Sequence, residues 1–264
     1  MGDDGTVRPT RRSVDVRGST LENSALVART GASALSLTVV DNVALTPSMR
    51  RVRLAATELP GLAHRPGQDL MLAVPAGGDR HYRRRYTIRR LDRAAGVVDL
   101  DVVLHGDGPG ARWARDAAAG DRIEALGPRG KITVDPDARW HLFAGDDSAL
   151  PATLAMVEAL GDGGRATAVL EVGGPGDEQE PDVALGVVVD LRWGHRGDRD
   201  PGHPGFLVDA LGEVPLPEGP GRAYLAGELA VVAAMRRTLL GRGLDPGQVS
   251  SKPYWRKGAA NAAQ

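Results

Sequence analysis

Alternating apolar and polar residues mark the first half of the chain. Leu35, Leu37 and Val39 alternate with Ser36 and Thr38, and the same two-residue period returns between residues 97 and 104. Shorter apolar runs lie at residues 51–55, 69–74, 86–89, 121–126 and 132–134, with turns rich in Gly and Pro between most of them. Because short, regularly spaced strands separated by turns are typical of small antiparallel barrels, we expect a β-barrel here.

The pattern changes near Pro136. Strand-like runs at residues 140–144, 167–172, 186–191 and 223–226 alternate with helical patterns that begin near residues 149 and 229. Such alternation predicts a parallel sheet with helices on its faces. The sequence therefore divides into a flexible N-terminal tail at residues 1–33, an antiparallel β-barrel domain at 34–136 and a parallel-sheet α/β domain at 137–264.

Composition narrows the possible functions. The chain of 264 residues has a net charge of −1, 4% aromatic residues and no cysteine. These values exclude disulfides, cysteine-bound clusters and thiol nucleophiles, and they disfavour a nucleic-acid partner. The six histidines lack metal-ligand spacing, so no built-in metal site is expected. Since the sequence has neither a signal-peptide pattern nor an apolar membrane segment, we expect a cytoplasmic protein without a membrane partner.

The densest motif is His-Tyr-Arg-Arg-Arg-Tyr-Thr-Ile-Arg-Arg at residues 81–90. On a strand, Arg84 and Tyr86 project from the same side. A guanidinium can pair with a pyrophosphate while a phenol ring packs on an isoalloxazine. The Thr87 hydroxyl can hydrogen-bond the reactive edge of a flavin. A basic strand is also typical of a solvated surface, so this motif alone leaves both interpretations open.

A second motif is the glycine-rich turn Leu-His-Gly-Asp-Gly-Pro-Gly-Ala-Arg-Trp-Ala at residues 104–114. Glycines before a helix leave backbone N–H groups free to approach a phosphate, and the helix dipole favours an anion there. In a chain with 35 glycines such a turn is also ordinary, and His105 alone is more often a structural histidine. We interpret Asp146 and Asp147, which precede a helical pattern, as N-caps.

Further motifs follow these two in order along the chain. They are Leu126-Gly-Pro-Arg-Gly130, Gly145-Asp-Asp-Ser-Ala-Leu-Pro-Ala152, Ala226-Gly-Glu228 and Tyr254-Trp-Arg-Lys-Gly258. Together, over about residues 35–260, they resemble the siderophore-interacting protein family, a branch of the ferredoxin-reductase-like flavoproteins. The resemblance implies that the barrel binds FAD and that the α/β domain is NAD(P)H-binding-like, with a C-terminal segment that closes over the flavin.

The resemblance also implies roles for particular residues. Those expected to hold the flavin ring and its phosphates are Arg84, Tyr86, Thr87 and Arg89. Those expected along the diphosphate or adenosine are His105, Gly108, Pro109, Gly110 and Ala111. Those expected where nicotinamide meets flavin are Asp146, Ser148 and Ala149, and those expected to close the pocket are Tyr254, Trp255 and Arg256. Thr87 and Ser148 are the expected catalytic residues. Arg50, Arg51, Lys252 and Lys257 are weaker candidates for substrate binding, because each is also ordinary surface charge.

The activity implied by the resemblance is transfer of electrons from NAD(P)H, or from a ferredoxin, through FAD to a ferric siderophore. Reduction releases iron because Fe(II) is more labile than Fe(III) on hard oxygen ligands. One departure is Ala111, which stands where the family has a serine hydroxyl. Two alternatives stay open on the sequence alone. One is a biosynthetic flavoprotein of the same fold that catalyses a different, even redox-neutral, cyclisation or isomerisation of a natural-product intermediate. The other is a non-catalytic siderophore-binding protein.

Overall fold

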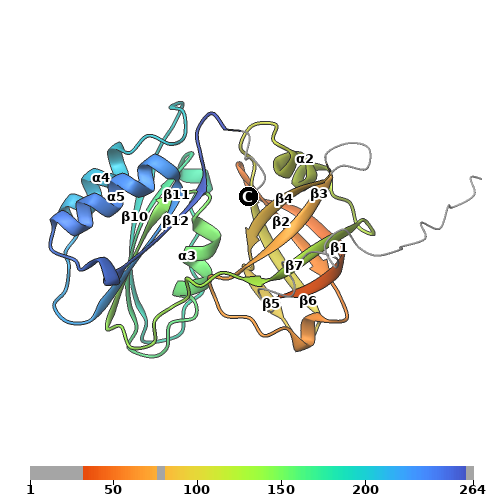
Figure 1. Ribbon diagram of the computed structural model, residues 1–264, viewed down its shortest axis with the longest axis horizontal. Coiled ribbons are helices and arrows are strands. Elements are labelled where there is room, and N and C mark those ends of the chain that lie inside the picture. Colours follow the sequence, from red (N-terminus) through yellow and green to blue (C-terminus); the bar gives the residue numbers. More distant parts are fainter. Residues whose placement is uncertain (1–31, 76–80, 260–264) are drawn as a thin grey trace, which may run out of the picture.

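The computed structural model describes residues 32–75 and 81–259, and within them the chain forms two sheets that lie side by side (Figure 1). The first sheet is antiparallel and has seven strands. Its strands are β1 (Ser33–Thr46), β2 (Met49–Ala55), β3 (Asp69–Pro75), β4 (His81–Thr87), β5 (Arg90–Asp92), β6 (Val97–Val103) and β7 (Arg122–Arg129). A 3-10 turn, η1 (Leu59–Gly61), follows β2, and helix α2 (Pro109–Asp116) follows β6.

This first sheet curls into a barrel whose two edges meet at one short segment. Its strand order is β4-β3-β7-β1-β2-β6-β5, so the two edge strands are consecutive in the chain. The Ile88 N–H donates to the Gln68 carbonyl at 2.9 Å, just before β3, and the Arg89 N–H donates to the Asp99 carbonyl of β6, also at 2.9 Å. The chain thus crosses from one edge to the other at residues 88–89. The predicted antiparallel barrel is confirmed.

Alternation along the strands fills the barrel interior. Leu37, Leu72 and Leu100 are fully buried in one apolar cluster, as the two-residue period predicts. The acidic residues of β6 face the other way and are nevertheless buried, because arginines of β2 pair with them. Arg51 Nε lies 2.7 Å from Asp101 Oδ1, and Arg53 Nε lies 2.8 Å from Asp99 Oδ1. These cross-strand ion pairs cover the outer face.

The second sheet is parallel and has the strand order β10-β9-β8-β11-β12. Its elements are β8 (Trp140–Asp146), α3 (Leu150–Val157), β9 (Arg165–Val172), η2 (Pro175–Asp177), β10 (Val188–His195), α4 (Gly205–Glu213), β11 (Gly221–Glu228), α5 (Leu229–Gly241), η3 (Pro246–Gln248) and β12 (Val249–Trp255). Helices α4 and α5 pack on one face and α3 packs on the other (Figure 1). The predicted parallel sheet with helices on its faces is confirmed.

The structure differs from the sequence-based expectation at three places. Residues 132–134 were expected to form a strand, which is wrong: Gly130 takes a left-handed φ of +105°, which ends β7, and Ile132 and Val134 pack instead beside α3. Helix α4 and strand β12 were not predicted. The expected tail, residues 1–33, lies outside the described residues except for Ala32, which is buried, and Ser33, which begins β1.

Polar and apolar contacts join the two sheets. Met49 of β2 is buried in the same cluster as α3. Arg89 binds Glu158, at the end of α3, through two hydrogen bonds of 2.7 and 2.5 Å. Asp177 accepts hydrogen bonds from the Ser48 N–H at 3.0 Å and the Ser48 hydroxyl at 2.7 Å. These contacts join the barrel to the parallel-sheet domain at the end of α3 and at the segment that follows β9.

None of the helices in the described part of the chain combines the length and the hydropathy needed to cross a lipid bilayer.

Candidate functional site

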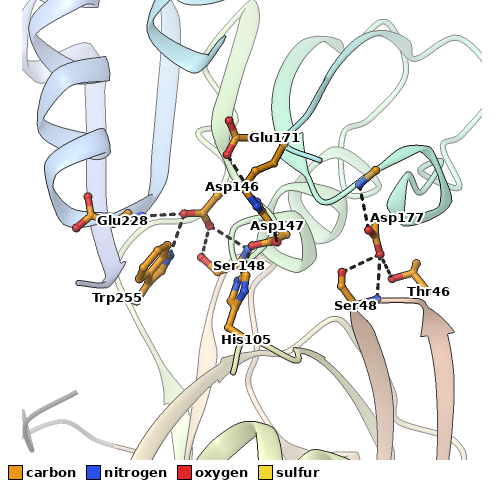
Figure 2. A network of polar contacts seen from close by, with 12 residues as sticks. Thr46, Ser48, His105, Asp146, Asp147, Ser148, Glu171, Asp177, Glu228 and Trp255 are labelled. Atoms are coloured by element: carbon orange, nitrogen blue, oxygen red, sulfur yellow. Dashed lines mark hydrogen bonds and ion pairs between the residues drawn. The ribbon is translucent and has the colours of Figure 1, made fainter. Parts of the chain in front are cut away.

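Polar side chains gather where the parallel strands end. Asp146 ends β8, Glu171 lies near the end of β9, Arg196 follows β10, Glu228 ends β11 and Trp255 ends β12. Because all five strands run in one direction, their carboxyl ends lie along one edge of the sheet, which is where open α/β sheets bind ligands. Figure 2 shows Asp146 and Trp255 in contact at this edge, with Glu171 nearby and His105 of the barrel beside Asp147, while the Glu228 carboxylate points away from Asp146.

Asp146 is the most highly connected of these residues. It is buried, and its carboxylate accepts hydrogen bonds from the Glu228 N–H and from Trp255 Nε1, both at 2.9 Å, and from the hydroxyl and the N–H of Ser148 (Figure 2). Burial, followed by the charge of Asp147, raises its pKa. Gly227 has a φ of +132°, and a Cβ built there would lie 2.6 Å from Asp146 Oδ2. Only glycine therefore allows β11 to approach this carboxylate.

Asp147 links the two sheets. Its Oδ1 lies 2.7 Å from His105 Nε2, and its Oδ2 accepts a 2.8 Å bond from Arg196. Arg196 also lies 3.6 Å from the Glu171 carboxylate. Burial opposes the charge of Asp147, but His105 and Arg196 outweigh it and lower the pKa of this carboxyl. Burial likewise opposes protonation of His105, and the hydrogen bond and charge of Asp147 outweigh it and raise the imidazole pKa.

The interpretation of Asp146 and Asp147 as N-caps is wrong. Helix α3 begins at Leu150, its N-cap is Ala149, and no side chain caps it. Both carboxylates instead bind partners from other strands and from the barrel. Ser148 and Ala149 complete this tight connection between β8 and α3.

Arg84, Tyr86 and the start of α2 come together on the barrel. A Cβ built on Gly110 would lie 2.1 Å from Tyr86 Oη and 3.7 Å from Arg84 Cγ, so α2 can approach this strand only through a glycine. The Tyr86 and Trp113 rings lie 6.0 Å apart. No side chain caps the N-terminus of α2, which begins after Gly108 with Pro109 in its first turn and runs on through Ala111. Free backbone N–H groups beside a guanidinium fit a diphosphate.

Thr87 projects from the opposite face of β4, toward the C-terminal strand. Thr87 lies near Tyr254, whose pKa burial raises to about 12 while Thr87 opposes that shift. Lys252 Nζ lies 5.1 Å from the centre of the Tyr254 ring and 2.9 Å from Asp69 Oδ2. The sequence motifs indicated Thr87, Tyr254 and Lys252 separately, and the structure brings all three together.

Asp69 has more cationic side chains around it than its single negative charge can neutralise. Arg85 binds it through two bonds of 2.8 and 2.6 Å, and Lys252 binds it as well. Arg129 lies near Arg85 and Asp69. Burial, followed by the charge of Arg85, lowers the pKa of the Arg129 guanidinium. We call Asp69, Arg85, Arg129 and Lys252 the Asp69 cluster. It adjoins the site, since Asp69 lies opposite Thr87 in the β3–β4 register.

Other predicted site residues lie apart from these groups. Arg89 has a side chain only 4% exposed, held by Glu158 and near Asp101. Arg50 donates to the Asn42 side chain and carbonyl, and Arg51 to Asp101. Lys257 is exposed, 3.4 Å from Asp200, and Arg256 is exposed directly after β12.

Sequence motifs did not indicate Asp69, Arg85, Arg129, Glu171 or Arg196 as site residues. Glu171 carries one usable signal, because it lies at the carboxyl end of the predicted strand 167–172. Arg196 lies five residues beyond the predicted strand 186–191 and is brought to a strand end only by the longer observed β10. Asp69 carries none, since its partners come from β4, β7 and β12.

Comparison with known families agrees with this geometry. Residues 66–132 match the model of the siderophore-interacting FAD-binding domain, and residues 138–258 match the model of the siderophore-interacting protein. The first match covers β3 to β7, with the Arg84–Tyr86–Gly110 contact. The second covers the parallel sheet and the residues at its carboxyl edge. The donor set found on the barrel therefore fits FAD.

Individual proteins support the same relationship. The crystal structure of a siderophore utilization protein from T. fusca superposes with a TM-score of 0.79 at 31% identity, over 88% of this chain and 95% of that one. The ferric vibriobactin reductase of Vibrio cholerae is 32% identical over 179 residues, which are 66% of this chain and 65% of that reductase. The NADPH-dependent ferric-chelate reductase of Escherichia coli is 26% identical over 180 residues, 67% of this chain and 68% of that one. A protein of Mycobacterium bovis is 36% identical to this chain over 189 residues. The chain spans 65% of the length of that protein and 65% of the length of the Vibrio reductase, which is just under two thirds.

Proposed function

The chain belongs to the siderophore-interacting protein family, and from this membership and the site's geometry we propose that it is an FAD-dependent ferric-siderophore reductase. When bound, FAD supplies the ability to accept two electrons together and to release them one at a time. The donor is NAD(P)H or a reduced ferredoxin, the acceptor is ferric iron in a siderophore, and the product is Fe(II). We place this activity in the cytoplasm.

One observation carries the proposal. The 2.7 Å contact between His105 Nε2 and Asp147 Oδ1 brings the glycine-rich turn of the barrel to the carboxyl edge of the parallel sheet. A flavin held on the barrel and a nicotinamide held at the sheet edge then share one site. The names of the Vibrio and Escherichia relatives, both reductases of ferric chelates, support the same assignment.

The residues of this chain take distinct roles in that function. Arg84 and the N–H groups at the start of α2 bind the diphosphate, and Tyr86 orients the cofactor on the barrel. Thr87, near Tyr254, offers a hydrogen bond at the flavin edge. Ser148, fixed by Asp146, offers one to the nicotinamide. The indole of Trp255, fixed on Asp146, excludes water from the junction.

The Asp69 cluster supplies the attraction for the acceptor. Arg85 and Lys252 bind one carboxylate and Arg129 lies near it, so the cluster keeps net positive charge next to Thr87 and Tyr254. Side chains with this excess charge draw anionic ligands and speed their encounter. We propose that an anionic ferric siderophore docks here, through Lys252, Arg85 and Arg129, while Arg50, Arg51 and Lys257 take no part.

A flavin titration tests the function. The purified full chain, loaded with FAD, is titrated without oxygen with NADH, NADPH and reduced ferredoxin in turn, and its visible absorbance is followed. We expect bleaching by at least one donor, and recovery on addition of a ferric siderophore with Fe(II) trapped by a colorimetric chelator. Absence of bleaching with all three donors would overturn the reductase, and turnover of a natural-product intermediate without bleaching would favour the redox-neutral alternative.

A further inference from the structure

Strand β10 forms one margin of the parallel sheet, and no strand in the described ranges pairs with its outer edge. The Val188 N–H donates to the Gly164 carbonyl and the Arg196 N–H to the Val172 carbonyl, both at 2.9 Å. Even-numbered residues of β10 therefore turn their backbone groups toward β9. It follows that Val189, Leu191 and Trp193 direct their N–H and C=O groups outward, where another strand can pair with them.

The order of side chains along β10 is symmetric about Leu191. One step on either side stand Asp190 and Arg192, which have opposite charges. Two steps on either side stand Val189 and Trp193, which are both apolar. A strand with this order is complementary to a second copy of itself running in the opposite direction, which is the requirement of a two-fold interface. We propose that two copies of the chain associate through antiparallel pairing of β10, with Leu191 opposite Leu191.

Backbone geometry agrees with that register. With Leu191 at the centre, each outward-facing residue meets an outward-facing residue of the second copy: Leu191 meets Leu191, and Val189 meets Trp193 twice. These positions become hydrogen-bonded pairs, with Cα atoms about 5.5 Å apart. Asp190 and Arg192 fall at the intervening non-hydrogen-bonded pairs, where Cα atoms are about 4.5 Å apart and side chains are closest. The backbone groups and the charges are therefore satisfied in the same register.

The side chains at this edge are available for such pairing. Arg192 and Asp190 are 35% and 50% exposed and, within the described part of the chain, pair only with each other, at 2.8 Å. Val188 is 57% exposed and Leu185, just before the strand, is 98% exposed. Charges on an edge strand ordinarily prevent pairing. Here each charge would meet its opposite, so the same residues favour the second copy over an unrelated strand.

A charge-exchange series tests the pairing in the full-length holoprotein by sedimentation velocity over a range of concentrations. The wild type should sediment at twice the mass of one chain. Asp190→Arg and Arg192→Asp each place like charges opposite one another, and we expect the dimer dissociation constant to rise about tenfold or more. The double variant Asp190→Arg/Arg192→Asp restores opposite charges and should restore the dimer. Flavin content reports that each variant is folded.

A cysteine pair tests the register, since the natural chain has no cysteine. Leu191→Cys places two thiols at the two-fold axis, within the Cα separation that a disulfide accepts. Val189→Cys, on the same face two residues away, places them on the order of 13 Å apart. We expect oxidation to cross-link the first variant and not the second. A wild type that is monomeric at every concentration, single charge variants that dimerise as the wild type does, or equal cross-linking of both cysteine variants would overturn the proposal.

Discussion

His105 Nε2 lies 2.7 Å from Asp147 Oδ1, and this hydrogen bond crosses from the barrel to the parallel sheet. The imidazole pKa is raised in the folded protein by Asp147, so protonation strengthens the contact. A raised folded-state pKa contributes stability that is present below the unfolded-state value, about 6.5 for histidine, and that is lost as the pH rises through the folded-state value.

The first prediction concerns pH. We expect His105→Gln to lower the free energy of unfolding more at pH 6 than at pH 8.5, by about 1 kcal/mol, a figure reduced because the side chain is 34% exposed. Urea unfolding at the two pH values measures this. His81→Gln, at an exposed position, serves as the control and should show no such difference. An equal or larger loss at pH 8.5 would contradict the prediction.

The second prediction concerns the approach of α2 to β4. Gly110→Ala places a Cβ 2.1 Å from Tyr86 Oη, so either the ring or the helix start must move. We expect the dissociation constant for FAD, measured by flavin fluorescence, to rise about tenfold, the effect of losing one charge-assisted contact. Gly212→Ala, in α4 with nothing within 4 Å of its Cβ, is the control and should bind FAD as the wild type does.

The third prediction concerns Arg89, which the sequence motif placed at the flavin. In the structure its guanidinium binds Glu158 and lies near Asp101, with 4% of the side chain exposed. Arg89→Met removes both hydrogen bonds to Glu158, whose side chain is 13% exposed, while Asp101 keeps Arg51. We therefore expect a loss of about 3 kcal/mol in unfolding free energy, from the Glu158 carboxylate alone. Lys257→Met removes an exposed pair and should change stability by less than about 1 kcal/mol. If Arg89→Met instead weakens FAD binding without lowering stability, the flavin role is right.

The fourth prediction concerns the Asp69 cluster. Lys252→Met and Arg129→Met should each raise the KM for an anionic ferric siderophore about tenfold and reduce its dependence on ionic strength, with flavin bleaching by the donor unchanged. Stopped-flow reoxidation measures both effects, and Lys257→Met is the matched control. Burial lowers the pKa of Lys252 below that of an ordinary lysine, which is about 10.4. As the pH is raised, Lys252 should therefore lose its charge, and KM should rise, at a lower pH than an ordinary lysine would give. Unchanged KM in both cluster variants would remove the docking site.

The period of apolar residues predicted the strands correctly where the apolar side chains of a strand are also the ones buried in a core. The alternation of Leu35, Leu37 and Val39 marks β1, and the apolar run of β8 marks the centre of the parallel sheet. Strand β12 lacks this signal: it contains Ser250, Lys252 and Pro253 and lies at a margin of the sheet, where few side chains are buried. Its strand conformation is fixed by pairing with β11, which no local pattern encodes.

The candidate site could be predicted only where its residues lie close together in the sequence. Arg84 and Tyr86 are two residues apart, so the period of a strand suffices to place them together. Asp147 depends on His105 and Arg196, which lie far from it in the sequence and meet it only through the topology. An acidic residue before a helix ordinarily caps that helix, and this local rule gave the wrong interpretation because partners from other strands were stronger.

The closure of the barrel at residues 88–89 has a consequence for how this sequence can change. Thr87, beside the expected flavin edge, is followed directly by the two amides that tie β3 to β6. Mutations in this tripeptide therefore act on redox chemistry and on the integrity of the fold together. We expect residues 87–89 to tolerate fewer substitutions than the neighbouring exposed arginines, because a single substitution there affects both the flavin site and the closure of the barrel.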